Sequence, residues 1–231
     1  VVTKFPRFPF DKFPGADRQL GTQMKATGEV MSIGRSFEES FLKAVRSLET
    51  KTDHLEQKDM ADMSDGELLS RIHERDDERI FAIAQYLRNG GDPERVVRET
   101  RMDPFFIDHL MVILALEAEA KDPAAVGNRD LLRKLKRNGF SDAWIARQWG
   151  MSEQALYELR KQEGIVPVFK MVDTLHTGKY IAYLYSSYTG ENASRLTDKK
   201  KIVVLGAGPI RIGQGVEFDY STVHAVKTIR N

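Results

Sequence analysis

The sequence predicts a mainly α-helical protein, in which a helical bundle is flanked by incomplete α/β segments. Between about residues 50 and 163, apolar residues recur at helical spacing behind typical N-cap residues. Residues 1–5, 28–34 and 167–185 are instead rich in residues typical of extended chain. Residues 199–231 have the pattern of a buried strand, a glycine-rich turn and a helix. Because a parallel strand needs neighbouring strands and none follows, we expect the chain to be part of a larger protein.

Composition excludes several classes of function. Hydrophobic residues make up 41% of the chain, enough for a core, and the net charge of +1 gives no bulk attraction to nucleic acid or acidic membranes. The chain has no cysteine, which excludes a disulfide framework and thiolate chemistry. The longest apolar run, residues 110–116, is too short to span a bilayer, and the first residues do not have a signal-peptide pattern. We expect a soluble, cytoplasmic fragment.

The first zone, up to about residue 50, contains both strands and the first helix. Residues 1–5 are expected to form a strand that Pro6 interrupts, and residues 28–34 a second strand between glycines. Ser36 and Glu39 have the spacing of a capping box, so a helix is expected to begin there.

The helical zone begins after a polar stretch, residues 50–63, which is interpreted as a linker. A second capping box follows at Ser64 and Glu67, and a helix is expected from Asp76 or Asp77. Residues 89–91, Asn-Gly-Gly, favour left-handed backbone and should end that helix.

The next helix is unusual because it is apolar on most sides. Asp103 and Pro104 give it an N-cap and a proline at its first position, and it should continue to about Lys121. A helix of this kind is either central to a core or shared with a partner chain. Three further N-caps and two terminating glycines are expected after it: Asn128, Ser141, Ser152, Gly139 and Gly164.

The glycine loop near the end of the chain is the first candidate binding site. Its glycines are Gly206, Gly208 and Gly213. Backbone amides at such a strand-to-helix turn can hold an anion. Arg211 stands where a dinucleotide fingerprint has its third glycine, and no Lys-Ser/Thr pair follows as in a P-loop. By spacing alone a packing turn is as plausible as a ligand loop. The polar residues at the strand's carboxyl end favour an ionisable small molecule: Arg211, Gln214, Glu217 and Asp219.

A second pattern, between Ser141 and Arg160, has the rhythm of a helix-turn-helix. Glu153 and Glu158 would meet DNA phosphate there, so we favour two packed bundle helices and keep a DNA-binding regulator as the alternative. The basic residues 133–137 are interpreted as a solvated helix end. The five histidines are scattered, so no metal site is expected.

Together these motifs resemble the large subunit of carbamoyl-phosphate synthase. Four N-terminal stretches, VVTKFPRF, KFPGAD, TQMK and GEVMSIGR, are similar to the end of its carboxyphosphate half. LGAGP with RIGQGVEFDY, residues 205–220, is similar to the start of its carbamoyl-phosphate half. The resemblance implies three regions: the end of the carboxyphosphate domain over 1–50, a helical oligomerisation domain with an extended connector over 51–198, and the first β-loop-α unit of the carbamoyl-phosphate domain over 199–231.

The resemblance also implies the parent activity. That enzyme is an ATP-grasp ligase that makes carbamoyl phosphate from bicarbonate, ammonia derived from glutamine, and two ATP, for arginine and pyrimidine synthesis. Its cofactors would be ATP and Mg²⁺ or Mn²⁺, and its partners a glutaminase small subunit and other large subunits, with no nucleic acid and no membrane. The ATP-grasp cores would lie outside this segment. We therefore expect no catalytic residue, no metal, no synthase activity and no tight ATP binding in the isolated fragment.

Two candidate sites follow from the resemblance. One wall of the carbamate tunnel would be formed by Arg211, Gln214, Gly215 and Glu217. Association between large subunits would use the apolar helix, with these interface candidates: Phe105, Phe106, Leu110, Ile113 and Leu114. A different ATP-grasp ligase, based on the glycine loop alone, remains the other alternative.

Overall fold

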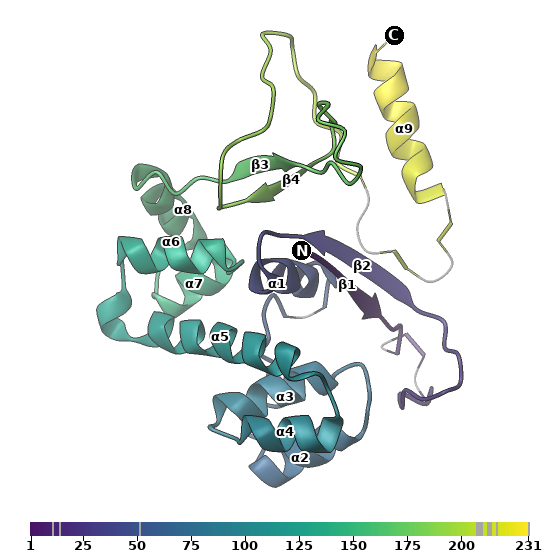
Figure 1. The fold of residues 1–231 in the computed structure, drawn as a ribbon, viewed down its shortest axis with the longest axis vertical. Coiled ribbons are helices and arrows are strands. Elements are labelled where there is room, and N and C mark those ends of the chain that lie inside the picture. The colour runs from purple at the N-terminus through teal and green to yellow at the C-terminus, as the bar shows by residue number, and fades with distance from the viewer. Residues whose placement is uncertain are drawn as a thin grey trace.

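The computed structural model describes residues 1–10, 12–13, 15–50, 52–206, 210–211, 214–215 and 217–230, without the side chains of Glu217 and Phe218. Over this part of the chain it contains nine α-helices, one short 3₁₀ helix and two small two-stranded sheets (Figure 1). The predicted mainly α fold class is confirmed. None of the helices within these residues has the length and hydropathy of a membrane span.

The first sheet pairs β1 (Val2–Arg7) with β2 (Gly28–Ile33) in antiparallel register and covers α1 (Phe37–Ser47). The expected interruption at Pro6 is wrong, because β1 continues to Arg7. Pro6 lies opposite Glu29, whose backbone N–H and C=O both bond to Ile210. The strand therefore needs no N–H donor at Pro6, and proline is tolerated there.

The two predicted capping boxes differ. At α2 (Asp65–His73) the Ser64 hydroxyl and the Glu67 carboxylate cap each other's backbone, as predicted. At α1 the Ser36 hydroxyl accepts from the Glu39 N–H at 3.2 Å, but the Glu39 carboxylate accepts from the Arg35 N–H at 2.7 Å. Only half of the first box is therefore formed.

The predicted linker over 50–63 is part of the core. Its described residues form neither helix nor strand. The side chains of His54, Leu55 and Met60 are nonetheless buried. The sequence did not predict their burial, because the stretch is polar overall and the three positions follow neither a helical nor a strand period.

Three helices follow on one side of the bundle: α2, α3 (Arg79–Arg88) and α4 (Pro93–Thr100). Helix α3 begins slightly later than predicted, after Glu78. Helix α4 was not predicted, although Asp92 caps it and Pro93 occupies its first turn. This is the same Asp-Pro signal that predicted the next helix, so the sequence did contain the information.

Helix α5 (Pro104–Lys121) is the spine of the bundle and lies between two groups of helices (Figure 1). On one side are α3 and α4, and on the other are α6 (Arg129–Arg137), α7 (Asp142–Gln148) and α8 (Glu153–Gln162). The short 3₁₀ helix, Pro123–Ala125, follows α5 directly. All three predicted N-caps accept from backbone N–H groups, and both predicted glycines have positive φ: Asn128, Ser141, Ser152, Gly139 and Gly164.

After the bundle the chain forms β3 (Val168–Met171) and β4 (Leu184–Ser187), an antiparallel pair. The hydroxyl of Ser187 donates to the buried Glu39 carboxylate at 3.2 Å, which ties this hairpin to α1. Helix α9 (Glu217–Arg230) ends the described chain. The predicted strand before the glycine loop is not formed, and Leu205 within it is 91% exposed. A parallel strand requires hydrogen-bonding neighbours, and none of the described residues provides them.

Gly139 lies against the backbone of α1. Its φ is +89°, and a Cβ there would lie 2.8 Å from the Glu39 Cα. Gly127 has φ +77° with open space around it. Gly127→Ala should therefore lower the free energy of unfolding by roughly 1–3 kcal/mol, through backbone strain alone. Gly139→Ala should lower it by about 1–3 kcal/mol more, because the added methyl group also overlaps α1. Urea unfolding of both variants measures the difference, and equal losses would contradict this packing role.

Candidate functional sites: the α5 face and the glycine loop

The structure places the predicted site residues in two separate regions, the long helix α5 and the loop before α9 (Figure 1). No group of three or more potential metal ligands occurs among the described residues.

The outward side of α5 is apolar and exposed. Phe105 is 48% exposed, Met111 38% and Val112 44%. Ala115 and Ala118 continue the same side and are also exposed. These residues, the α5 face, are spaced so that they share one side of a helix with 3.6 residues per turn. Exposed apolar side chains gathered in this way are typical of interaction surfaces.

The predicted interface residues divide between this surface and the core. Phe105 and Phe106 are exposed, at 48% and 42%. Leu110, Ile113 and Leu114 are buried in the chain's own core, so the candidate interface is corrected to exclude them. Because α5 is apolar on most sides, its sequence did not reveal which side faces inward. Met111 and Val112 were missed for the same reason.

Phe105 is held by neighbouring aromatic rings. Its ring meets Phe37 edge-on at 5.3 Å between centroids and His109 at 4.3 Å. His109 is itself fixed, because its Nδ1 lies 2.5 Å from an oxygen of the Glu38 carboxylate. Edge-to-face packing of this kind adds stability beyond area burial. The exposed part of Phe105 is therefore presented on a supported ring.

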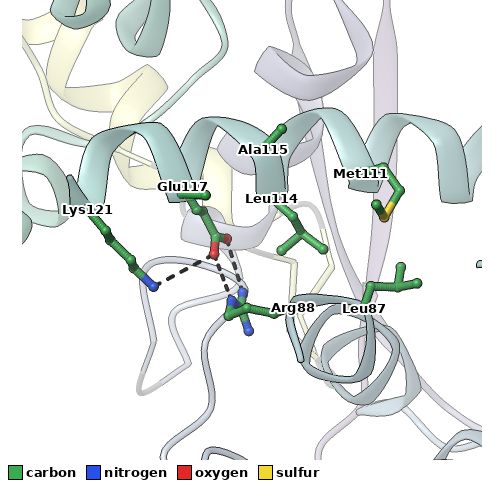
Figure 2. Close-up of a pocket in the computed structure, with 8 residues that line it drawn as sticks. Leu87, Arg88, Met111, Leu114, Ala115, Glu117 and Lys121 are labelled. Atoms are coloured by element: carbon green, nitrogen blue, oxygen red, sulfur yellow. Dashed lines mark hydrogen bonds and ion pairs between the residues drawn. The ribbon is translucent and has the colours of Figure 1, made fainter. Parts of the chain in front are cut away.

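A pocket of about 290 Å³ lies between the end of α3 and the middle of α5 (Figure 2). Most of its wall is apolar, and one end holds charged groups (Figure 2). Its lining residues are Leu87, Arg88, Met111, Leu114, Ala115, Glu117, Ala118 and Lys121. The pocket therefore adjoins the α5 face and shares Met111, Ala115 and Ala118 with it.

Glu117 forms the charged end of the pocket and is only 2% exposed. Its carboxylate accepts from Arg88 at 2.7 and 3.0 Å, and the His54 Nε2 lies 2.8 Å away. Burial by itself raises the pKa of this carboxyl, but the hydrogen bonds from His54 and Arg88 outweigh it and lower the pKa to about 2. Lys121 is paired with Glu56 at 2.8 Å. Since each cation at the pocket has a carboxylate partner, the pocket favours an uncharged, apolar occupant.

The glycine loop contacts the first sheet. Ile210 and Glu29 exchange two backbone hydrogen bonds of 2.9 and 3.0 Å. A Cβ on Gly28 would overlap the Ile210 carbonyl oxygen, so only glycine fits there. Gly206 is similarly close to α9, because a Cβ added to it would overlap the Thr222 hydroxyl. Glycine at these two positions lets the backbone lie close to Ile210 and to Thr222.

The predicted tunnel residues are only partly described. Arg211 pairs with Glu49 on the exposed surface, and its N–H donates to the Gln214 side chain at 2.9 Å. Gly215 is exposed. Glu217 begins α9, but its side chain lies outside the described part, as do Gly208 and Gly213. The structure therefore brings Arg211 and Gln214 together and leaves the other positions as predictions.

The helix-turn-helix pattern corresponds to α7 and α8, joined by buried charges. Arg160 is 5% exposed and donates to Asp142 at 3.1 Å. Lys136, in the basic run expected to be solvated, is also 5% exposed and pairs with Asp142 at 2.6 Å, which corrects that expectation. Burial lowers the pKa of the Lys136 ammonium to about 8. These charges join α6, α7 and α8 and are not available to a nucleic acid.

Two family models match the chain. The model described as carbamoyl-phosphate synthetase large chain, oligomerisation domain, matches residues 29–164, more than half of the chain. It covers α1 to α8 and so includes the α5 face and the pocket. The model described as carbamoyl phosphate synthase preATP-grasp domain matches residues 198–231, which contain the glycine loop and α9.

The ion pair at Glu117 should make stability depend on acid pH. Because its folded pKa is about 2 against an ordinary 4.5, its contribution is complete above pH 4.5 and is lost as pH falls toward 2. Glu117→Gln leaves Arg88 without its charged partner and should lower the free energy of unfolding by about 3 kcal/mol at pH 7. The deficit relative to the unaltered chain should shrink between pH 4.5 and 2, measured by urea unfolding.

Glu119→Gln is the matched control, because Glu119 is exposed and, among the described residues, pairs only with Lys134 on the surface. This substitution should lower the free energy of unfolding by less than about 1 kcal/mol at pH 7. A Glu117→Gln deficit that is equally small, or that stays constant down to pH 2, would contradict the role assigned to Glu117.

Proposed function

Because this chain belongs to the family of the carbamoyl-phosphate synthetase large-chain oligomerisation domain, we propose that its helical bundle associates one large subunit with another. The parent enzyme would make carbamoyl phosphate from bicarbonate, glutamine-derived ammonia and two ATP, together with a glutaminase small subunit, in the cytoplasm. The product would enter arginine and pyrimidine synthesis. ATP and Mg²⁺ or Mn²⁺ serve the parent reaction, and we assign no catalytic residue to the described part of this chain.

The observation that carries this proposal is the apolar α5 face. Fully burying a side chain such as Phe105, Met111 or Val112 contributes roughly 1.5–3 kcal/mol, and each is already about half buried. Together they offer a few kcal/mol toward association, to which neighbouring residues of the α5 face would add. A second chain covering this surface would remove it from water.

We also propose that the glycine loop forms one wall of a passage for carbamate. Two contacts support this role: the backbone pairing of Ile210 with Glu29, and the pairing of Arg211 with Glu49. They place the loop of the preATP-grasp match against the beginning of the chain. Arg211 would attract the anionic carbamate, with Gln214, Gly215 and Glu217 along the same wall.

The DNA-binding alternative is not favoured, although α7 and α8 form the two helices that its pattern requires. Glu153 and Glu158 are exposed on α8, where they would repel phosphate. Arg160 on the same helix is directed inward to Asp142. A different ATP-grasp ligase is likewise not favoured, because the family match names the synthetase large chain.

Val112→Asp should weaken association, because it places a charge in the centre of the α5 face. We expect sedimentation velocity to show a concentration-dependent dimer for the unaltered chain, and a dissociation constant at least tenfold higher for the variant, equivalent to ~1.4 kcal/mol. Val126→Asp is the matched control, since Val126 is 48% exposed but lies outside α5. A strictly monomeric unaltered chain, or equal effects of both variants, would refute the proposed interface.

The passage is tested in the complete synthase. Gly28→Ala must displace Ile210, since no room exists for the added methyl group. We expect less carbamoyl phosphate formed per ATP consumed, because carbamate escapes where the wall has moved. Gly21→Ala is the control, as a Cβ there meets nothing within 4 Å. An unchanged ratio in Gly28→Ala would count against the tunnel wall.

A further inference from the structure

We propose that Glu49 is a positioning residue for the glycine loop: its carboxylate holds the Arg211 guanidinium at the end of α1. The effect of this role on the reaction rests on the proposed carbamate passage. Glu49 lies in the residues that match the oligomerisation domain, and Arg211 lies in those that match the preATP-grasp domain. The pair therefore joins the two matched regions of the chain.

The backbone of Glu49 is the first observation. Glu49 directly follows Leu48, the C-cap of α1, and its φ is +52°, in the left-handed region. Helices usually place glycine at this position, because other residues are strained there. Strained residues of this kind are frequent at functional sites. The chain has a glutamate instead of glycine at this position, and its carboxylate pairs with Arg211.

The second observation is that α1 gives Glu49 a rigid support. Helix α1 lies between the first sheet and the helical bundle (Figure 1). At its beginning, a Glu38 carboxylate oxygen lies 2.5 Å from the His109 Nδ1 of α5. Near its end, the Arg46 guanidinium donates to the carbonyl oxygen of Gly139. A side chain is positioned most precisely when it stands on an element that is itself fixed.

The third observation concerns Arg211 itself. Its neighbour Ile210 exchanges two backbone hydrogen bonds with Glu29 of β2, and the Arg211 N–H donates to the Gln214 side chain at 2.9 Å. These bonds fix the backbone of the loop. The guanidinium has Glu49 as its only partner among the described residues. Its position therefore depends on Glu49.

The pairing also leaves donors for an anion. Glu49 accepts from the terminal nitrogen Nη2 of Arg211. A guanidinium has five N–H donors in a rigid planar fork, so a contact at one nitrogen limits the orientation of all the others. The remaining N–H groups have no partner within the described part of the chain. In the proposed passage, Glu49 would thus orient these donors toward carbamate without occupying them.

Glu49→Gly tests this role in a variant that still folds, because glycine adopts a φ near +52° without strain. We expect its midpoint of urea unfolding to be unchanged or higher. Hydrogen exchange of the Ile210 N–H, which donates to Glu29, should become about two- to fivefold faster, the effect of losing an exposed ion pair. Glu49→Gln, which removes the charge and keeps the shape, should accelerate the same exchange.

Arg101→Gly is the matched control. Arg101 is the C-cap of α4, has a φ of +56° and is exposed. Its side chain forms no hydrogen bond or ion pair with any residue that the structure describes. The control should relieve similar strain and leave the exchange at Ile210 unchanged. In the complete synthase, both Glu49 variants should form at least twofold less carbamoyl phosphate per ATP consumed, and Arg101→Gly should not.

The outcomes separate this role from the proposed passage. If exchange at Ile210 is unchanged in both Glu49 variants, or equally fast in Arg101→Gly, the positioning role is refuted. A lower urea midpoint in Glu49→Gly would also refute it, because Glu49 would then stabilise the bundle itself. If exchange is faster but the product per ATP is unchanged, Glu49 positions the loop and the passage fails. If only Gly28→Ala lowers that ratio, the passage stands without Glu49.

Discussion

The buried carboxylate of Glu117 is the constraint on which the helical part of the structure depends. It is removed from water, so it must be matched by the guanidinium of Arg88 and the imidazole of His54. These partners come from α3 and from the irregular segment before α2, and Glu117 itself is on α5. One ionised group thus fixes three segments relative to one another. It also keeps one end of the pocket neutral while the rest of its wall is apolar.

Most of the fold could be predicted because its signals are local. Helix starts and ends are set within one helical turn, by N-cap residues, by proline at the first helical position and by terminating glycines. Helices α5 to α8 all begin where their N-cap residues predict. The errors required information from distant residues. Pro6 remains in a strand because the backbone of Glu29, its partner residue, bonds to Ile210 instead. His54 is buried against Phe140 and Trp144, which come much later in the chain.

The candidate sites were less predictable than the fold. The sequence showed that α5 is apolar but not which side its neighbours cover, so Leu110 and Ile113 were assigned to the wrong side. The pocket depends on Leu87 and Arg88 from α3 meeting α5, and no pattern within either helix indicates that meeting. Lys136 was expected in solvent because basic residues usually are, yet Asp142 compensates its burial.

The contacts of the glycine loop have a consequence for how the chain folds. Arg211 and Glu49 are 162 positions apart in the sequence, and the whole helical bundle lies between them. Contacts of such separation require a long loop to be closed first, whereas the bundle consists of neighbouring helices. We infer that the bundle forms early and brings the two ends together, so that the loop attaches last. Substitutions that destabilise the bundle should then slow formation of the contact between Arg211 and Glu49, although the substituted residues do not touch either side chain.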